Sequence, residues 1–136
     1  MTLAFLPLLL AAAETSTLEV DVDNLRNGKG VIQACLTRDR QHFPDCKSDP
    51  AALKRTVSSH APRLLFTGLP PGEYAVALFH DENANQRFDT MLGIPREGFG
   101  FSRNPVVRFG APRFDKVSMQ LAPGYTRIRV RLQYLL

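Results

Sequence analysis

The sequence predicts an all-β protein, a single antiparallel β-sandwich of about seven strands. Three observations predict this fold. Apolar and polar residues alternate with a period of two in several short runs, as in half-buried strands. Ten prolines and nine glycines mark frequent turns. No stretch of the 136 residues carries the apolar period of a helix of ordinary length. This length fits one domain with a core of its own.

Residues 1–13, MTLAFLPLLLAAA, are apolar or small and contain no charged side chain. The run is shorter than the roughly 20 residues that span a bilayer. It resembles the apolar core and small-residue cleavage region of a secretory signal. We expect residues 1–13 to be a signal peptide and residues 14–136 to be the sandwich, exported to the periplasm or beyond the cell. The mature chain would then have no transmembrane segment. A buried first strand or helix is the alternative.

The first two strands are expected over residues 18–22 and 31–37. In the first, the apolar residues Leu18, Val20 and Val22 alternate with acidic ones. Between the two strands lies NLRNGKG, residues 24–30, whose Asn-Gly dipeptide favours a tight hairpin turn. The two strands should therefore pair with each other in antiparallel orientation.

Residues 38–62 are irregular, and we expect a long excursion with at most one helical turn near residues 51–54. The cysteines Cys35 and Cys46 flank the start of this excursion. In an oxidising compartment they could form a disulfide, worth on the order of 3 kcal/mol. We predict that bond, with two unpaired thiols as the alternative. Without a nearby pair of histidines, two cysteines make a poor zinc site.

The run 74–79 is apolar on both faces, so it is expected in the middle of the core. It follows a short strand at 64–66 and the turn GLPPGEY, residues 68–74. Residues 92–105 are rich in glycine and aromatic side chains and show no period. Strands are expected again at 106–109 and 114–121. The last strand has one apolar face, and its other face carries three arginines, Arg127, Arg129 and Arg131.

Two stretches of the sequence carry a resemblance to a known family. GLPPGEYAVALFHDENANQRFDT, with LGIPREGFGFS behind it, resembles the bacterial family catalogued as domain of unknown function 2141. That family has the signatures NLPPGxYAVAxFHDENxNGxLD and GIPxEGxGFS, and its members look like exported proteins. Its opening, VxVxNLRNxKGxV, is matched by residues 20–32 with Ile32 in the last place. The resemblance implies no activity. The LPPGEY turn also resembles one in prealbumin-like and carboxypeptidase-regulatory-like sandwiches, which implies an immunoglobulin-like or prealbumin-like fold.

The stretch HDENANQRFDT, residues 80–90, is the strongest candidate for a site. Its polar residues follow the spacing of a calcium loop, in which oxygen ligands alternate along the chain. The candidate metal ligands, with one acid from outside the loop, are Asp81, Asn83, Asn85, the Arg87 carbonyl, Asp89 and Glu97. Two parts of the motif are missing. Gln86 replaces the glycine at the bend, where a left-handed backbone would be costly, and Leu92 replaces the bidentate glutamate.

The alternative for this loop is a turn in which Asp and Asn side chains accept hydrogen bonds from nearby backbone amides, with no metal. The sequence leaves both hypotheses open. Any calcium site with so few carboxylates would be weak, with a Kd of roughly 10⁻⁴–10⁻³ M.

Three functions follow from these residues. The first is an exported, non-catalytic binding or structural module that presents the Gly/Phe segment to an envelope protein or a glycan. The second is a metal-dependent enzyme using His80, Asp81 and Glu97, although no catalytic motif is present. The third is an anion-binding surface on Arg127, Arg129 and Arg131. Nucleic acid is not expected as a partner, because the arginines lack interleaved aromatic side chains.

Overall fold

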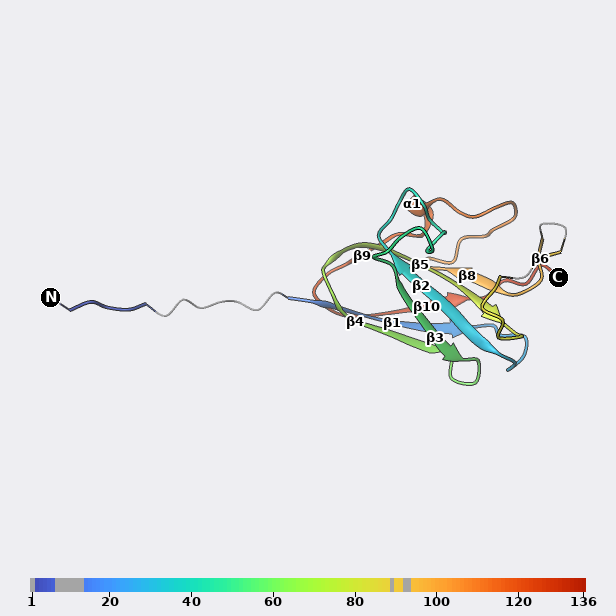
Figure 1. Cartoon of the computed structure of the whole chain (residues 1–136), viewed down its shortest axis with the longest axis horizontal. Coiled ribbons are helices and arrows are strands. Elements are labelled where there is room, and N and C mark those ends of the chain that lie inside the picture. Colours follow the sequence, from blue (N-terminus) through green and yellow to red (C-terminus); the bar gives the residue numbers. More distant parts are fainter. Residues whose placement is uncertain (1, 7–13, 89, 92–93) are drawn as a thin grey trace.

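Two β-sheets pack face to face (Figure 1). The computed structural model describes residues 2–6, 14–88, 90–91 and 94–136. The smaller sheet has the order β10-β1-β4, that is, Gly124–Arg131, Ser16–Asp23 and Arg63–Leu69. The larger sheet has the order β3-β2-β5-β8, that is, Leu53–Ser58, Val31–Thr37, Gly72–Asp81 and Phe99–Phe101. β9 (Met119–Leu121) pairs with the start of β5, β6 (Thr90–Met91) pairs with β7 (Ile94–Pro95), and α1 is Phe114–Val117.

The predicted all-β sandwich is confirmed, with short additional strands beyond the seven expected. Its core lies between the sheets and is built from the alternating apolar residues of the long strands. Each of these strands buries one face, since successive side chains point to opposite sides of a sheet. The main contributors are Leu18, Val20, Val22, Ile32, Leu36, Leu64, Phe66, Tyr74, Val76, Leu78 and Val130.

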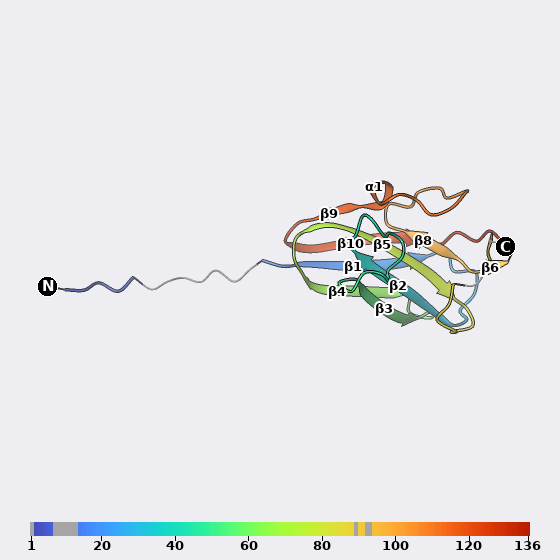
Figure 2. The same ribbon diagram turned by 45° about the horizontal axis from the view of Figure 1, so that its top comes forward.

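β5 occupies the middle of the larger sheet, as predicted from its two apolar faces. Its even-numbered residues enter the core between the sheets. Its other face is covered by a second apolar cluster, to which α1 contributes Phe114 and Val117 and the 38–62 excursion contributes Phe43. This outer layer of loops and α1 is visible above the sheets in Figures 1 and 2. β5 therefore packs against apolar side chains on both sides.

The predicted hairpin between the first two strands is wrong. β1 and β2 lie in different sheets, and residues 24–30 cross from one sheet to the other. β1 pairs instead with β4 in antiparallel and with β10 in parallel orientation, so the sandwich is not purely antiparallel. The Asn-Gly dipeptide predicts a chain reversal, but it carries no information on which sheet the following strand joins. Gly30 stands at the end of this crossing with a φ of 64°.

Four smaller predictions also need correction. The excursion expected to be irregular over residues 38–62 contains the strand β3, Leu53–Ser58, which pairs with β2. Residues 106–109 form no strand, and the stretch 114–121 divides into α1 and β9. The aperiodic segment 92–105 contains β8, whose three residues are all buried, so no alternation reveals it.

The predicted disulfide between Cys35 and Cys46 is confirmed, with Cα atoms 6.5 Å apart. It ties the excursion to the central strand β2. Of the predicted signal peptide, residues 7–13 lie outside the described residues, and residues 2–6 are exposed and have no regular structure. The signal peptide therefore stays a prediction. Within the described part of the chain, no helix has the length and apolar character needed to cross a membrane.

Candidate functional site

The end of β5 carries two fully buried polar residues, His80 and Asp81. They are consecutive in a strand, so their side chains point to opposite faces of the sheet. His80 follows Leu78 toward the space between the sheets, while Asp81 lies on the outer face, within hydrogen-bond distance of Gln33 on β2. A single pocket cannot hold both side chains as they stand.

Both ring nitrogens of His80 are hydrogen-bonded. Nε2 lies 2.6 Å from the Lys29 carbonyl oxygen, which can only accept, so Nε2 carries a hydrogen. Nδ1 lies 2.9 Å from the Tyr134 hydroxyl, which itself accepts a bond from the Arg26 amide. Burial raises the pKa of Tyr134, so the phenol keeps its proton. His80 thus joins the 24–30 crossing to the C-terminal segment, and no ring nitrogen is left for a substrate.

The Asp81 carboxylate folds its own loop. Oδ1 accepts a bond from the amide of Asn85 at 3.1 Å, and Oδ2 accepts one from the amide of Gln86 at 2.8 Å. Gln33 Nε2 donates to Oδ2 at 3.2 Å. The backbone carbonyl of Asp81 also accepts a bond from the Ala84 amide. These are the bonds expected of a self-capped turn.

Two asparagines of the loop act in the same way. Asn83 Oδ1 accepts a bond from the Asn85 amide, and Asn85 Oδ1 accepts one from the Arg87 amide at 2.9 Å. Another predicted ligand, Asp89, lies outside the described residues. Asp81, Asn83 and Asn85 therefore each accept hydrogen bonds from backbone amides of the loop.

Gln86 adopts the left-handed backbone conformation, with φ of 64°, and Ala84 also has a positive φ of 53°. The glycine that the family pattern has at position 86 fits such a backbone without strain. A non-glycine residue pays roughly 1–2 kcal/mol there. Residue 86 thus has the left-handed backbone at which glutamine is expected to be more costly than glycine.

Two glutamates continue the network on its outer side. Glu97, only 4% exposed, accepts a bond from the Glu82 amide at 2.8 Å. The Glu82 carboxylate accepts bonds from Arg26 Nε and from Asn27 Nδ2, both at 2.9 Å. Burial alone would raise the pKa of Glu82, but the hydrogen bonds and charge of Asn27 and Arg26 outweigh it and lower the pKa. Glu97 therefore supports the loop backbone through Glu82.

The 24–30 crossing approaches this network too closely for any side chain at Gly30. A Cβ atom there would lie 2.0 Å from the Asp81 carbonyl oxygen and 2.7 Å from two backbone atoms of Glu82. The crossing thus supplies Arg26, Asn27 and the Lys29 carbonyl to the loop. Sequence reasoning missed these partners, although NLRNGKG was a quoted part of the family resemblance. The signal that could have found them is that NLRNGKG and the polar loop both belong to the family signature.

No group of three or more His, Cys, Asp or Glu side chains that could hold a metal occurs among the described residues. Of the predicted ligands, Asp81, Asn83 and Asn85 share the loop. Glu97 approaches it from the segment between β7 and β8, through the Glu82 amide. Calcium at this loop stays a prediction.

The arginine strand β10 lies beside an acidic partner. In the parallel register, Glu19 pairs with Arg127, Asp21 with Arg129 and Asp23 with Arg131. Arg127 Nε lies 2.6 Å from Asp21 and 2.7 Å from Glu19, and Arg129 Nε lies 3.2 Å from Asp23. Most of the cationic charge of this face is therefore balanced within the smaller sheet.

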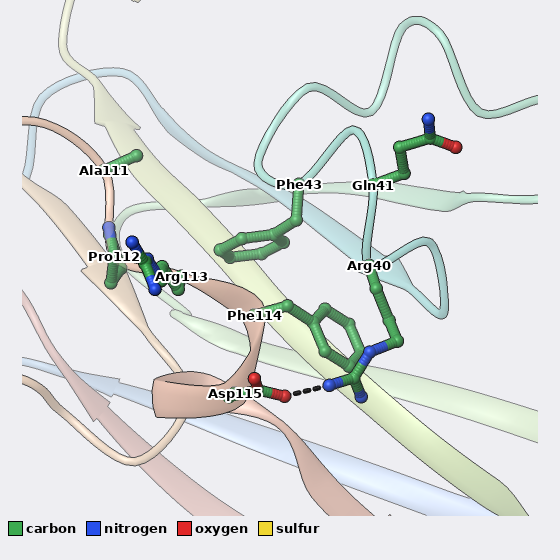
Figure 3. A pocket seen from close by; sticks show the side chains of 8 residues that line it. All are labelled: Arg40, Gln41, Phe43, Ala111, Pro112, Arg113, Phe114 and Asp115. Carbon is green, nitrogen blue, oxygen red and sulfur yellow. Dashed lines mark hydrogen bonds and ion pairs between the residues drawn. The ribbon is translucent and has the colours of Figure 1, made fainter.

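A pocket of about 370 Å³ lies away from this network. Figure 3 shows its aromatic floor, Phe43 and Phe114, between Arg113 on one side and Arg40 on the other. Arg40 is paired with Asp115 and stacks over the Phe114 ring at 5.0 Å. His80, Asp81 and Glu97 line neither this pocket nor the shallow one beside Arg63 and Arg129.

Fold and site together define an all-β sandwich whose central strand ends in a polar loop held by its own backbone. The match to a family model, described as an uncharacterized protein conserved in bacteria (DUF2141), covers residues 20–129. The chain belongs to this family. No curated protein and no solved structure matches it.

Proposed function

We propose that the protein is an exported, non-catalytic binding module in which the loop after β5 is a self-capped structural element. Export is supported by the Cys35–Cys46 disulfide, because such bonds persist in oxidising compartments, and by the signal-like residues 1–13. A partner in the cell envelope, a protein, glycan or lipid surface, follows from that location.

The observation that carries the proposal is the use of every candidate catalytic group in holding the fold. His80 has both nitrogens bonded to structural groups, and the Asp81 carboxylate receives three bonds from its own loop and from β2. Glu97 receives the Glu82 amide. An acid, base or metal ligand needs a side chain that can reach a substrate or ion, and these contacts turn each one toward the protein itself. The arrangement favours a scaffold over an enzyme.

Thermal melting with and without calcium tests the self-capped loop. We expect the Tm of the full chain to be the same in EDTA and in 10 mM calcium, because the loop is ordered by its own hydrogen bonds. A site with a Kd of roughly 10⁻⁴–10⁻³ M would instead add about 1.4–2.7 kcal/mol at that concentration, or several degrees.

Two aspartate variants make the test specific. A calcium-induced rise in Tm that disappears in Asp89→Asn and persists in Asp45→Asn would refute the proposal in favour of a calcium site. Asp45 is a suitable control because its carboxylate caps Lys47 and Ser48 in an exposed turn of the excursion.

A further inference from the structure

Residues 103–113, RNPVVRFGAPR, form an exposed basic loop between β8 and α1, visible beside α1 in Figures 1 and 2. We call this segment the basic loop. From residue 98 to residue 116 the chain has four cationic side chains and a single acidic one, Asp115. That acid is paired with Arg40. The loop therefore carries a local positive charge that its own sequence does not balance.

The base of the basic loop is fixed to the sandwich. Arg103 donates to the Asp115 carbonyl at 2.9 Å, and the Asn104 side chain bonds both the Arg129 carbonyl and the Arg131 amide of β10. Further along, Gln133 donates to the Pro105 carbonyl at 2.8 Å. These bonds hold the loop in one direction relative to the sheets, so its tip is presented from a rigid support.

The tip of the loop exposes both apolar and cationic side chains. Phe109 is 96% exposed and Val106 is 80% exposed. Phe109 is the most exposed large apolar side chain among the described residues. Arg108 and Arg113 are exposed and take part in none of the ion pairs of the described chain. Gly110, with φ of 66° and open space around it, makes the turn next to Phe109. Two exposed apolar side chains thus lie close in sequence to two arginines that form no ion pair among the described residues.

The pocket of about 370 Å³ adjoins this tip, since Ala111, Pro112 and Arg113 form part of its wall. In Figure 3 Arg113 stands at the edge of the aromatic floor, opposite the pair of Arg40 and Asp115. Arg40 is already paired, whereas Arg113 forms no ion pair among the described residues. A phosphate group at the rim would be in reach of Arg113, beside an apolar surface.

We propose that the basic loop docks on the surface of an anionic phospholipid bilayer. Phe109 and Val106 enter the interface, and Arg108 and Arg113 contact lipid phosphates. Apolar side chains combined with nearby cations give the two forces that hold a protein on an anionic membrane. A protruding apolar tip suits a soft interface better than a flat protein partner, which would need an area of about 800 Å² per side. The inference rests on the proposed exported, non-catalytic role and names the partner of that module.

A single tryptophan tests the insertion directly, because the sequence contains no tryptophan. In Phe109→Trp, emission should shift to shorter wavelength when vesicles containing phosphatidylglycerol are added, and should not shift with pure phosphatidylcholine. The matched control is Leu65→Trp, at a 50% exposed position on β4, whose emission should stay unchanged. Residues 1–13 are the same in both variants, so binding through them alone would leave Trp at position 109 unshifted.

Charge variants test the arginines. Removing both cations in Arg108→Gln/Arg113→Gln should weaken binding to the phosphatidylglycerol vesicles about 25-fold, or about fivefold for each basic side chain near the surface. The control Lys54→Gln/Arg55→Gln makes the same change in net charge on β3 and should weaken binding far less. The Arg108→Gln/Arg113→Gln protein should melt at the temperature of the unmodified chain, since both side chains are exposed.

Three results would overturn the proposal. The first is unshifted emission of Trp at position 109 with saturating vesicles, whether the protein binds through other residues or not at all. The second is equal weakening by the two charge variants. The third is loss of vesicle binding in inorganic phosphate but not in chloride at equal ionic strength, with no shift in the emission of Trp at position 109. That result would assign the pocket to a free phosphate. A calcium-dependent Tm would refute the self-capped loop and leave these three results unaffected, so the two failures are distinguishable.

Discussion

The loop after β5 and the basic loop differ in where their polar groups are directed. In residues 80–86 the side chains bond groups of the same loop, of the 24–30 crossing or of the C-terminal segment. In residues 106–113 the arginines have no ion pair within the described chain, and Phe109 is almost fully exposed. The loop with the calcium-like motif thus directs its polar side chains toward the protein, and the basic loop, which has no such motif, exposes its side chains to solvent.

This difference teaches that a polar motif and an available site are separate properties. Aspartate and asparagine serve equally well as cation ligands and as caps for backbone amides, so composition alone does not decide between these roles. The direction in which the side chain points decides between a cation ligand and a cap. Asp81 is 0% exposed and accepts bonds from two amides of its own loop, which leaves its carboxylate committed to the fold.

The largest expected effect compares two glycines of nearly equal φ, Gly30 at 64° and Gly110 at 66°. Gly30→Ala should lower the free energy of unfolding by about 3–5 kcal/mol. The new methyl group would clash with the Asp81 carbonyl, and alanine at this positive φ would add backbone strain. Gly110→Ala has open space and should cost only about 1 kcal/mol. Urea denaturation measures both. Equal losses would mean that the loop after β5 yields as readily as the basic loop.

Removal of the capping carboxylate comes next. Asp81→Ala should lower the free energy of unfolding by about 2–4 kcal/mol, because amides of Asn85 and Gln86 and the Gln33 side chain lose their acceptor. Asp45→Ala removes a similar cap from an exposed turn and should cost under about 1 kcal/mol. Chemical denaturation of the pair is the measurement. A loss at Asp81 no larger than at Asp45 would contradict the scaffold role.

A smaller effect of opposite sign is expected at the left-handed bend. Gln86→Gly should raise the free energy of unfolding by about 0.5–1 kcal/mol, because glycine removes the strain of a φ of 64° and the side chain is exposed. Gln120→Gly, in the extended strand β9, should instead lower it by a similar amount. Thermal melting of both variants separates the two signs. A destabilised Gln86→Gly would show that the glutamine side chain itself holds the loop.

The smallest effect is the pH dependence of Glu82. Its pKa lies below the ordinary value of 4.5, so the folded state favours the ionised carboxylate. The stabilisation is present above about pH 4.5 and is lost as the pH falls through the lower pKa of the folded state. Glu82→Gln should remove about 0.5 kcal/mol at pH 7 and flatten the decline between about pH 4.5 and 3. Denaturation curves across that range check it, and an unchanged slope would contradict the role of Arg26 and Asn27.

Much of the sandwich could be predicted from the sequence because the patterns that indicate its strands and turns lie within short segments of the chain. The two apolar faces of residues 74–79 indicated a central strand, and the Asp and Asn spacing indicated either a turn or a cation loop. The Cys35–Cys46 bond was also predictable. In each case the residues that carry the signal are the residues that form the feature.

The partners of the loop could not be predicted, because they depend on sheet assignment. Residues 24–30 read as a hairpin, but they cross between the sheets and bring Arg26 to Glu82. Tyr134 reaches His80 across 54 positions of the chain. The parallel pairing of β1 with β10 likewise places Arg127 against Asp21, which neither strand indicates alone. Nothing in RNPVVRFGAPR distinguishes it from an ordinary connection until its exposure is known.

Amide hydrogen exchange of the full chain, with and without phosphatidylglycerol vesicles, tests the contrast between the two loops most directly. In EDTA and without vesicles, we expect the amides of Asn85 and Gln86 to be protected already, and those of residues 106–113 to exchange rapidly. Vesicles should slow exchange in residues 106–113 and leave residues 81–86 unchanged. Rapid exchange at Asn85 and Gln86 that slows only with calcium would contradict the self-capped loop. Vesicle protection confined to residues 81–86 would contradict the basic loop as the membrane-binding segment.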